Sequence, residues 1–185
     1  MSNPSIALLR ARWNVHQATA RITFMIYIFG NELAERYAYE ADGIEAVALY
    51  LSNRDHIPPE RTLSYKTDLL NLLLSKEMKG WSLPYTWDQA EAAGPSSPAG
   101  STWRLIQAEA HLEYNIECFG DWLAEGGSLG NLNGAEALRL YLVNKHHWHP
   151  ADVSALSLKT MGELLAAEMK GWTMTREQVA ATEPE

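Results

Sequence analysis

Cysteine is nearly absent from this sequence. Cys118 is the only one among 185 residues, so no disulfide can form within the chain. Sequences without disulfides are typical of reducing compartments. We therefore expect a cytoplasmic protein, with a lone thiol that packs in the interior rather than acting as a nucleophile.

Long apolar runs are also missing. The most apolar stretch, residues 22–29, is far shorter than the roughly 20 residues that span a bilayer. Residues 1–12 lack the continuous apolar segment of a signal peptide. We expect neither export nor a membrane partner.

Positive charge is scarce. The chain has 15 Lys and Arg against 23 Asp and Glu, a net charge of −8, and its basic residues form no cluster. Binding to a phosphate backbone needs clustered Lys and Arg, so nucleic acid is not an expected partner. The acidic balance is compatible with a basic protein partner.

The common catalytic and cofactor motifs are missing as well. The sequence has no Walker loop, no Gly-x-Gly-x-x-Gly turn, no nucleophile elbow and no Cys-x-x-Cys pair. It also lacks the Glu-x-x-His motif of di-iron helical bundles. We expect no cofactor, and an enzyme is the less favoured hypothesis.

What the sequence does contain is an internal repeat. The pentapeptide Glu-Met-Lys-Gly-Trp occurs at 77–81 and again at 168–172, and many other letters recur in the same order. This pattern predicts a tandem duplication of a module of about 90 residues. The predicted domains are a first repeat over 1–93, a Gly/Pro/Ser linker over 94–101 and a second repeat over 102–185, packed as a pseudo-twofold bundle.

Each repeat opens with a pattern that predicts a long helix, over residues 5–36 in the first. Apolar residues recur at spacings of three and four, as on one face of a helix. This stripe consists of Val15, Ala18, Ile22, Ile26, Phe29 and Leu33, and of Leu105, Ala108, Leu112, Ile116, Phe119 and Leu123. A second line widens the face with Trp13, Gln17, Ala20 and Phe24, and with Trp103, Gln107, Ala110 and Tyr114. We expect both lines to be buried.

Two features of these stretches complicate the helix. Residues 112–118 alternate apolar and polar letters, as a strand would, but the helical period extends further, so we prefer a helix. Glycine destabilises a helix interior by about 1 kcal/mol relative to alanine. Gly30 and Gly120 are therefore expected to kink or interrupt the helices.

The remaining elements are predicted from capping residues and prolines. Asp42 and Asn133, each followed three positions later by Glu, predict capping boxes that open second helices ending near residues 53 and 144. Proline-containing loops at 55–59 and 146–150 then interrupt the chain. Third helices are expected from Ser64 and Ser157 to the pentapeptides, and short fourth helices from Thr86 and Thr175. The predicted fold is all-α, with three main helices and a short fourth in each repeat.

The repeated pentapeptide has two interpretations. Gly80 and Gly171 can adopt the left-handed conformation that ends a helix, and the tryptophans can cover apolar surface behind it. The alternative is a ligand or partner surface lined by Trp81 and Trp172. A helix stop accounts for most of the letters and is preferred.

A histidine cluster follows the second helix of repeat two, at His146, His147 and His149. Imidazoles can hold Zn²⁺ or another transition metal. The spacing matches no standard zinc motif, and the first repeat has only Asp55 and His56 here. Exposed or capping histidines are the preferred interpretation.

A few ionisable residues are shared by both repeats. These pairs are Glu35 with Glu125, His56 with His147, and Glu77 with Glu168. They could serve as acids and bases in a pocket between the repeats. Charged residues on helices more often form a solvated face or pair along the helix, so no catalytic role is assigned.

The repeats differ along their first helices. Thr23, Met25 and Tyr27 in the first stand where the second has Glu113, Asn115 and Glu117. We therefore expect this helix face to be buried in the first repeat and exposed to solvent in the second. Large exposed apolar patches promote association, so something should cover Met25 and Tyr27. Packing within the chain is favoured over a second subunit or a partner.

Taken together, these features predict a non-enzymatic protein-binding or regulatory module with Trp and Tyr anchors on a helical surface. An antagonist that caps a basic partner is one form of it. The alternatives are a small-ligand binder or enzyme that uses His and Glu between the repeats, and a structural homo-oligomer.

Overall fold

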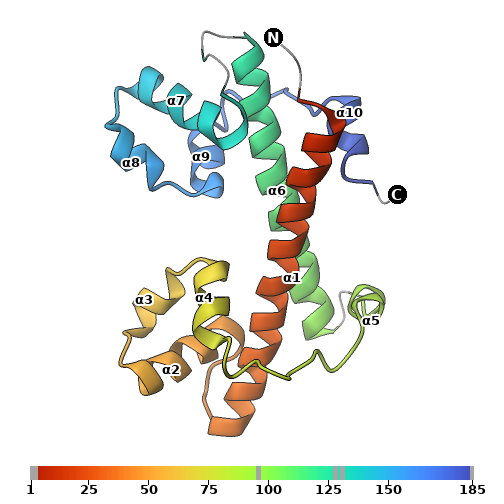
Figure 1. The fold of residues 1–185 in the computed structure, drawn as a ribbon, viewed down its shortest axis with the longest axis vertical. Coiled ribbons are helices and arrows are strands. Elements are labelled where there is room, and N and C mark those ends of the chain that lie inside the picture. The colour runs from red at the N-terminus through yellow and green to blue at the C-terminus, as the bar shows by residue number, and fades with distance from the viewer. Residues whose placement is uncertain (1–3, 95–96, 127–128, 130–131, 184–185) are drawn as a thin grey trace. The chain divides into compact units, whose positions relative to one another are not determined.

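The structure is a computed structural model that describes residues 4–94, 97–126, 129 and 132–183. Over these residues it contains α-helices and no strand (Figure 1). The all-α prediction is confirmed, and residues 112–118 are helical. None of the helices within the described ranges is both long and apolar enough to cross a membrane.

The chain forms two compact units. Unit 1 comprises residues 1–16 and 109–185, and unit 2 comprises residues 17–108. Each unit therefore combines the first turns of one long helix with the later part of the other and the helices that follow it. The division of contacts differs from the division of the sequence repeat, because α1 (Ile6–Tyr37) and α6 (Pro98–Gly126) each contribute residues to both units.

Unit 2 surrounds the later part of α1. α2 (Gly43–Asp55), α3 (Pro59–Leu63) and α4 (Thr67–Leu74) gather beside it (Figure 1), and α5 (Trp87–Ala92) follows. Its core consists of Ile26, Phe29, Leu33, Val47, Leu51, Leu70 and Leu74. A second aromatic group brings the rings of Phe24, Trp87 and Trp103 within 5.9 Å of one another.

Unit 1 surrounds the later part of α6. α7 (Gly134–His146), α8 (Pro150–Ser154) and α9 (Leu158–Leu164) lie against it, and α10 (Arg176–Ala180) closes the chain. The main core consists of Ile116, Phe119, Leu138, Leu142, Val153, Met161 and Leu165. A second cluster joins the first turns of α1 to α6 and the C-terminal segment through Leu9, Trp13, Tyr114, Cys118 and Ala181.

The predicted proline-containing loops are present over residues 56–58 and 147–149, and a short helix follows each of them. Pro59 and Pro150 occupy the first turns of α3 and α8, where proline loses no hydrogen bond and its fixed φ suits the helix. Ser64 ends α3 and does not open α4, which begins after Lys66. Ser157 does cap α9, as predicted, by accepting a hydrogen bond from the Thr160 N–H.

The predicted capping boxes are confirmed at two places and wrong at two others. Thr86 and Thr175 form full capping boxes that open α5 and α10. Asp42 and Asn133 precede α2 and α7, but neither side chain caps its helix. The caps come from the preceding long helices instead: the Gly43 N–H donates to Asn31 Oδ1 and the Gly134 N–H to Asp121 Oδ1, both at 2.7 Å.

Gly30 and Gly120 do not interrupt their helices. α1 and α6 run through them without a break. A Cβ at Gly30 would lie 1.9 Å from the Gly43 carbonyl oxygen, and one at Gly120 would lie 2.1 Å from the Gly134 carbonyl oxygen. Glycine is present because another backbone passes at these points.

The predicted apolar stripe is buried only in the later parts of the long helices. In the first turns Val15 and Leu105 are 64% and 62% exposed, whereas Trp13 and Trp103 of the second line are 7% and 1% exposed. The helical period was correct, but the buried face changes because the first turns and the later turns pack on different helices.

The predicted linker over 94–101 becomes helical before it ends. α6 begins at Pro98, and Ser97 Oγ accepts a hydrogen bond from the Gly100 N–H at 3.0 Å. Residues 95–96 of this segment lie outside the described residues.

Candidate functional site

The repeated pentapeptide forms turns that follow α4 and α9. Gly80 and Gly171 have φ of 80° and 84°, so the predicted left-handed conformation is confirmed. The helices themselves end earlier, at Leu74 and Leu164. The pentapeptide is therefore a connection after the helix rather than its last turn.

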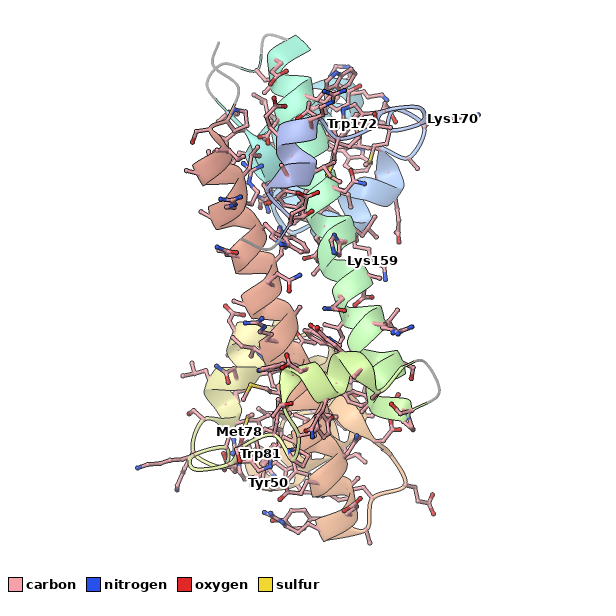
Figure 2. All side chains as sticks on the ribbon, turned by 90° about the vertical axis from the view of Figure 1, so that its right-hand side faces the viewer. Tyr50, Met78, Trp81, Lys159, Lys170 and Trp172 are labelled. Atoms are coloured by element: carbon pink, nitrogen blue, oxygen red, sulfur yellow. The ribbon has the colours of Figure 1, made fainter. Side chains whose placement is uncertain are left out.

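Trp81 and Trp172 are half-buried against the cores of their units. Each indole packs edge-on against a phenylalanine, Phe29 or Phe119, with ring centroids 5.3 Å apart. Figure 2 shows Trp81 together with Tyr50 and Met78, which contact the same core. These contacts explain the two tryptophans as packing residues, and a binding role for them stays a prediction.

Glu77 and Glu168 of the pentapeptides pair with cations at the ends of the second helices. Glu77 accepts a hydrogen bond from Arg54, and Glu168 pairs with Lys145. These carboxylates tie each turn to the last turn of α2 or α7. Together with the glycine and the tryptophan, they give most of the repeated letters a structural task.

The other ionisable residues that recur in the two halves of the sequence are exposed. Glu35 and Glu125 are exposed on the long helices. His56 and His147 are exposed and end α2 and α7 with left-handed φ of 58° and 55°.

The three histidines near α8 have separate roles. His146 packs on Trp148, with ring centroids 5.2 Å apart. His149 Nδ1 accepts a hydrogen bond from the Ala151 N–H and caps α8. Among the described residues, no three His, Cys, Asp or Glu side chains are placed to hold a metal ion, so the structure gives these histidines no metal geometry.

Tyr27 is covered by its own unit. Its ring lies so close to Gly43 that a Cβ there would be 2.2 Å from the ring. Tyr27 and Met25 are both half-buried. For Tyr27 at least, part of the cover that the sequence called for comes from α2.

A buried ionic cluster in unit 1 was missed by sequence reasoning. Glu113, Glu117 and Asp121 lie four residues apart on α6, and Arg12 and His16 lie four apart on α1. Arg12 Nη1 lies 2.7 Å from Asp121 Oδ2, and Arg12 Nε lies 3.4 Å from Glu117 Oε2. His16 contacts both glutamates, through Nε2 to Glu117 at 3.1 Å and Nδ1 to Glu113 at 3.4 Å.

The sequence predicts that Glu113 and Glu117 are exposed to solvent, which is wrong for Glu117, and it makes no such prediction for Asp121. The side chains of Glu117 and Asp121 are 16% and 1% exposed. The signal available in the sequence was the matching spacing: acids every four residues on one helix and bases four apart on another form complementary rows. Their sequence separation hid the pairing.

The cluster changes proton affinities. Burial by itself would lower the pKa of His16, but hydrogen bonds and charges from Glu113 and Glu117 outweigh it and raise the pKa to about 9. Burial raises the pKa of the neighbouring Cys118 to about 12. The thiol is thus protonated at neutral pH, which makes it a packed side chain rather than a nucleophile.

We expect stability to fall as the pH rises between 6.5 and about 9, the pKa of an ordinary imidazole and that of His16 in the folded state. Below this window His16 is charged in both states and its contribution is complete; above it the contribution is lost. The full effect is about 3 kcal/mol. Urea denaturation across this pH range measures it. His16→Gln should remove most of the change in unfolding free energy with pH, and His56→Gln should retain it. If both variants show the same pH dependence, His16 is not its source.

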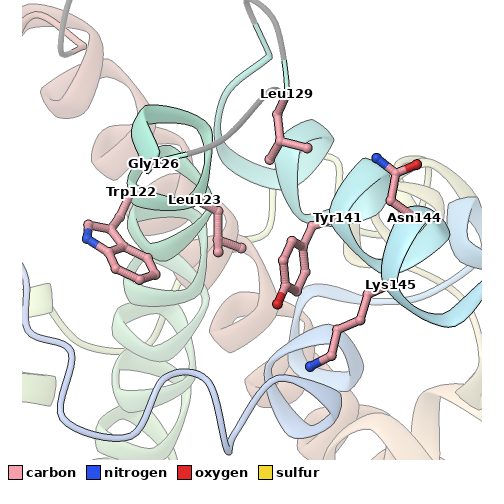
Figure 3. Close-up of a pocket in the computed structure, with 7 residues that line it drawn as sticks. All are labelled: Trp122, Leu123, Gly126, Leu129, Tyr141, Asn144 and Lys145. Carbon is pink, nitrogen blue, oxygen red and sulfur yellow. The ribbon is translucent and has the colours of Figure 1, made fainter.

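Unit 1 also holds an open pocket of about 480 Å³ (Figure 3). It is lined by Trp122, Leu123 and Gly126 of α6, Leu129, and Tyr141, Asn144 and Lys145 of α7. Trp122 stacks on Phe119 with ring centroids 5.2 Å apart and remains 48% exposed. The Lys145 ammonium lies 5.6 Å from the centre of the Tyr141 ring and also pairs with Glu168. Aromatic walls with a few polar groups can hold a ring or an apolar side chain.

Comparisons with protein-family models, curated proteins and solved structures find no match to this chain.

Proposed function

We propose that the chain is a non-enzymatic protein-binding module whose contact site is the pocket of unit 1. The observation that carries this proposal is an exposed tryptophan, Trp122, beside a pocket of about 480 Å³. Trp and Tyr contribute much of the binding energy at protein interfaces, mainly where they lie in pockets from which water is excluded. The anchor on this view is Trp122 rather than Trp81 or Trp172, whose rings are engaged with their own cores.

The charge of the chain supports a basic partner. The net charge is −8, and residues 94–185, which include the pocket, hold most of it. Complementary charge accelerates association and is weakened by salt. An antagonist of a basic protein is the specific form of this proposal.

We also propose that the chain arose by tandem duplication. Matching contacts in the two units support this origin. In each unit a glycine of the long helix lies against the backbone at the start of the next helix, and the residue after it accepts a hydrogen bond from that helix's first N–H. In each unit the pentapeptide tryptophan also packs on a phenylalanine, and the pentapeptide glutamate pairs with a cation. The residues concerned are Gly30, Asn31, Phe29 and Arg54 in one unit, and Gly120, Asp121, Phe119 and Lys145 in the other. The pseudo-twofold arrangement stays a prediction.

Small-ligand binding is the second candidate, because the pocket volume falls within the range of about 300–1,000 Å³ that ligand sites occupy. Its described lining contains no His or Glu. The acid and base residues proposed for an enzyme are therefore not part of this pocket. The homo-oligomer hypothesis, with an interface at Met25 and Tyr27, stays a prediction.

A partner capture with matched tryptophan variants tests the proposal. Full-length protein is used to isolate a partner, which is identified, purified and titrated back by calorimetry at low and moderate salt. Trp122→Ala should weaken binding at least tenfold, since removing a central aromatic anchor costs about 2 kcal/mol or more. Trp148→Ala removes an indole of similar exposure, 38% against 48%, outside the pocket and should change the affinity less than about threefold.

Two results would overturn the proposal. One is equal binding by Trp122→Ala and Trp148→Ala. The other is capture that yields no stoichiometric protein from the source lysate.

A further inference from the structure

The frame of the unit 1 pocket has a counterpart in unit 2. Tyr141, Asn144 and Lys145 of α7 align with Tyr50, Asn53 and Arg54 of α2. In both units the cation sits over the tyrosine ring, at 5.6 Å for Lys145 and 5.5 Å for Arg54. In both it also pairs with the glutamate of the pentapeptide. Two copies of one arrangement can therefore be compared side chain by side chain.

In unit 2 this frame is occupied by tyrosines of the chain itself. The ring of Tyr37 lies 5.6 Å from that of Tyr50. Tyr39 stacks on Tyr37 at 5.8 Å with an interplanar angle of 20°. The Asn53 amide donates a hydrogen bond to the Tyr39 hydroxyl at 3.2 Å. The asparagine thus recognises a phenol.

Unit 1 keeps the frame without these tyrosines. The letters aligned with Tyr37 and Tyr39 are Gly127 and Leu129. Glycine has no side chain, and position 127 lies outside the described residues. Leu129 is buried beside Ala124, Ala137 and Tyr141 and has no hydroxyl to offer. Asn144 and Tyr141 line the open pocket instead (Figure 3).

We propose that the pocket of unit 1 binds a phenol ring, supplied as a tyrosine side chain by the partner protein. The ring packs between Trp122 and Tyr141, and its hydroxyl accepts a hydrogen bond from the Asn144 amide. This inference rests on the proposed binding function and names the chemistry that the site selects. Aromatic contacts favour such a ring beyond its apolar area, and the hydroxyl adds selectivity over phenylalanine.

The charge around the pocket favours a neutral tyrosine. Lys145 is the one cation of the described lining, and Glu168 is paired with it. A phosphate would have to compete with that carboxylate, and no arginine of the described lining offers the bidentate geometry that phosphotyrosine sites use. We therefore expect phosphorylation of the tyrosine to weaken binding.

A titration of the full-length protein with blocked single amino acids tests the inference. N-acetyltyrosinamide should cause saturable shifts of the Asn144 side-chain amide in ¹⁵N–¹H spectra. It should bind about threefold to tenfold more tightly than N-acetylphenylalaninamide, the range expected for one hydrogen bond. The O-phosphorylated amide should bind more weakly than the tyrosine amide. Asn144→Ala should abolish the preference for tyrosine, whereas Asn53→Ala, in the occupied copy of the frame, should leave it intact.

A gain of binding provides a second test. The double variant Tyr37→Gly, Tyr39→Leu gives unit 2 the letters of unit 1. It should create a second site, seen as saturable shifts of the Asn53 side-chain amide that are absent in the parent protein. An unchanged Asn53 signal in a folded variant would overturn the idea that this frame recognises a phenol.

Failure of the inference and failure of the proposed function give different results. No saturable shift, or equal binding of the tyrosine and phenylalanine amides, overturns the inference. If a captured partner still depends on Trp122 in that case, the binding function stands with a different anchor. If the tyrosine amide binds but no partner depends on Trp122, the phenol selectivity stands and the protein-binding function falls.

Discussion

Gly120→Ala is expected to lower the free energy of unfolding by about 3 kcal/mol or more. The added methyl would lie 2.1 Å from the Gly134 carbonyl oxygen and 2.9 Å from the Leu138 side chain. A backbone carbonyl cannot rotate away as a side chain tip can, so α7 would have to move off α6. Alanine improves helix propensity by about 1 kcal/mol, which offsets only part of this cost. Gly30→Ala should behave alike, since its Cβ would lie 1.9 Å from the Gly43 carbonyl oxygen.

The control lies on the same helix. A Cβ at Gly126, the last residue of α6, would meet no heavy atom of the described part of the chain within 4 Å. Gly126→Ala should therefore leave stability unchanged or raise it by up to about 1 kcal/mol. Urea denaturation followed by circular dichroism compares the variants. If Gly120→Ala stays within about 0.5 kcal/mol of the parent, the close crossing of α6 and α7 is refuted.

Arg12→Thr is expected to cost about 3–5 kcal/mol, because it strands a buried carboxylate. The side chain of Asp121 is 1% exposed, and Arg12 Nη1 is 2.7 Å away. The Gly134 N–H would remain as a hydrogen-bond donor to Asp121, but the ion pair with Arg12 would be lost. Denaturation midpoints measure the loss. Lys159→Ala, which breaks a pair with Glu109 whose side chains are 58% and 52% exposed, should cost no more than about 1 kcal/mol.

Unit 2 suggests the rescue. Thr102 and Asn31 align with Arg12 and Asp121. Asn31 accepts a hydrogen bond from the Gly43 N–H, and the position that matches Arg12 is a threonine. The double variant Arg12→Thr, Asp121→Asn should therefore recover about 2 kcal/mol relative to Arg12→Thr alone. If the double variant instead loses as much unfolding free energy as the two single variants together, Arg12 and Asp121 do not stabilise each other.

Local features of the fold could be predicted from the sequence. The long helices follow from apolar spacing, the capping boxes at Thr86 and Thr175 from side chains three residues apart, and the turns at Gly80 and Gly171 from the need for a left-handed residue. Each of these depends on interactions within a few residues, which single-sequence reasoning can read.

Features that depend on distant residues could not be predicted. Asn31 caps the helix that starts twelve residues later, and Arg12 meets Asp121 across 109 residues. A nearby Asp42 offered a plausible but incorrect cap. The exposed Val15 has the same cause, because the face that a helix buries is set by the helices packed on it rather than by its own period.

The candidate pocket could be predicted in part from the sequence. Aligning residues 1–93 with residues 102–185 would have set Tyr37 and Tyr39 against Gly127 and Leu129, two aromatic residues against none. Sequence reasoning looked instead for letters that the repeats share, Trp81 and Trp172 above all. Shared letters mark packing in both units, whereas the difference marks the place where one unit has an open pocket.

α1 contributes its first turns to unit 1 and its later turns to unit 2. This division sets the order in which the two units can fold during translation. Unit 2 is one continuous stretch, residues 17–108, so it can close as soon as that stretch has been synthesised. Leu9 and Trp13 are synthesised before unit 2, whereas Tyr114 and Ala181, against which they pack, are synthesised after it. The apolar face of residues 6–16 of α1 therefore stays uncovered until all of unit 2 and part of α6 have been synthesised.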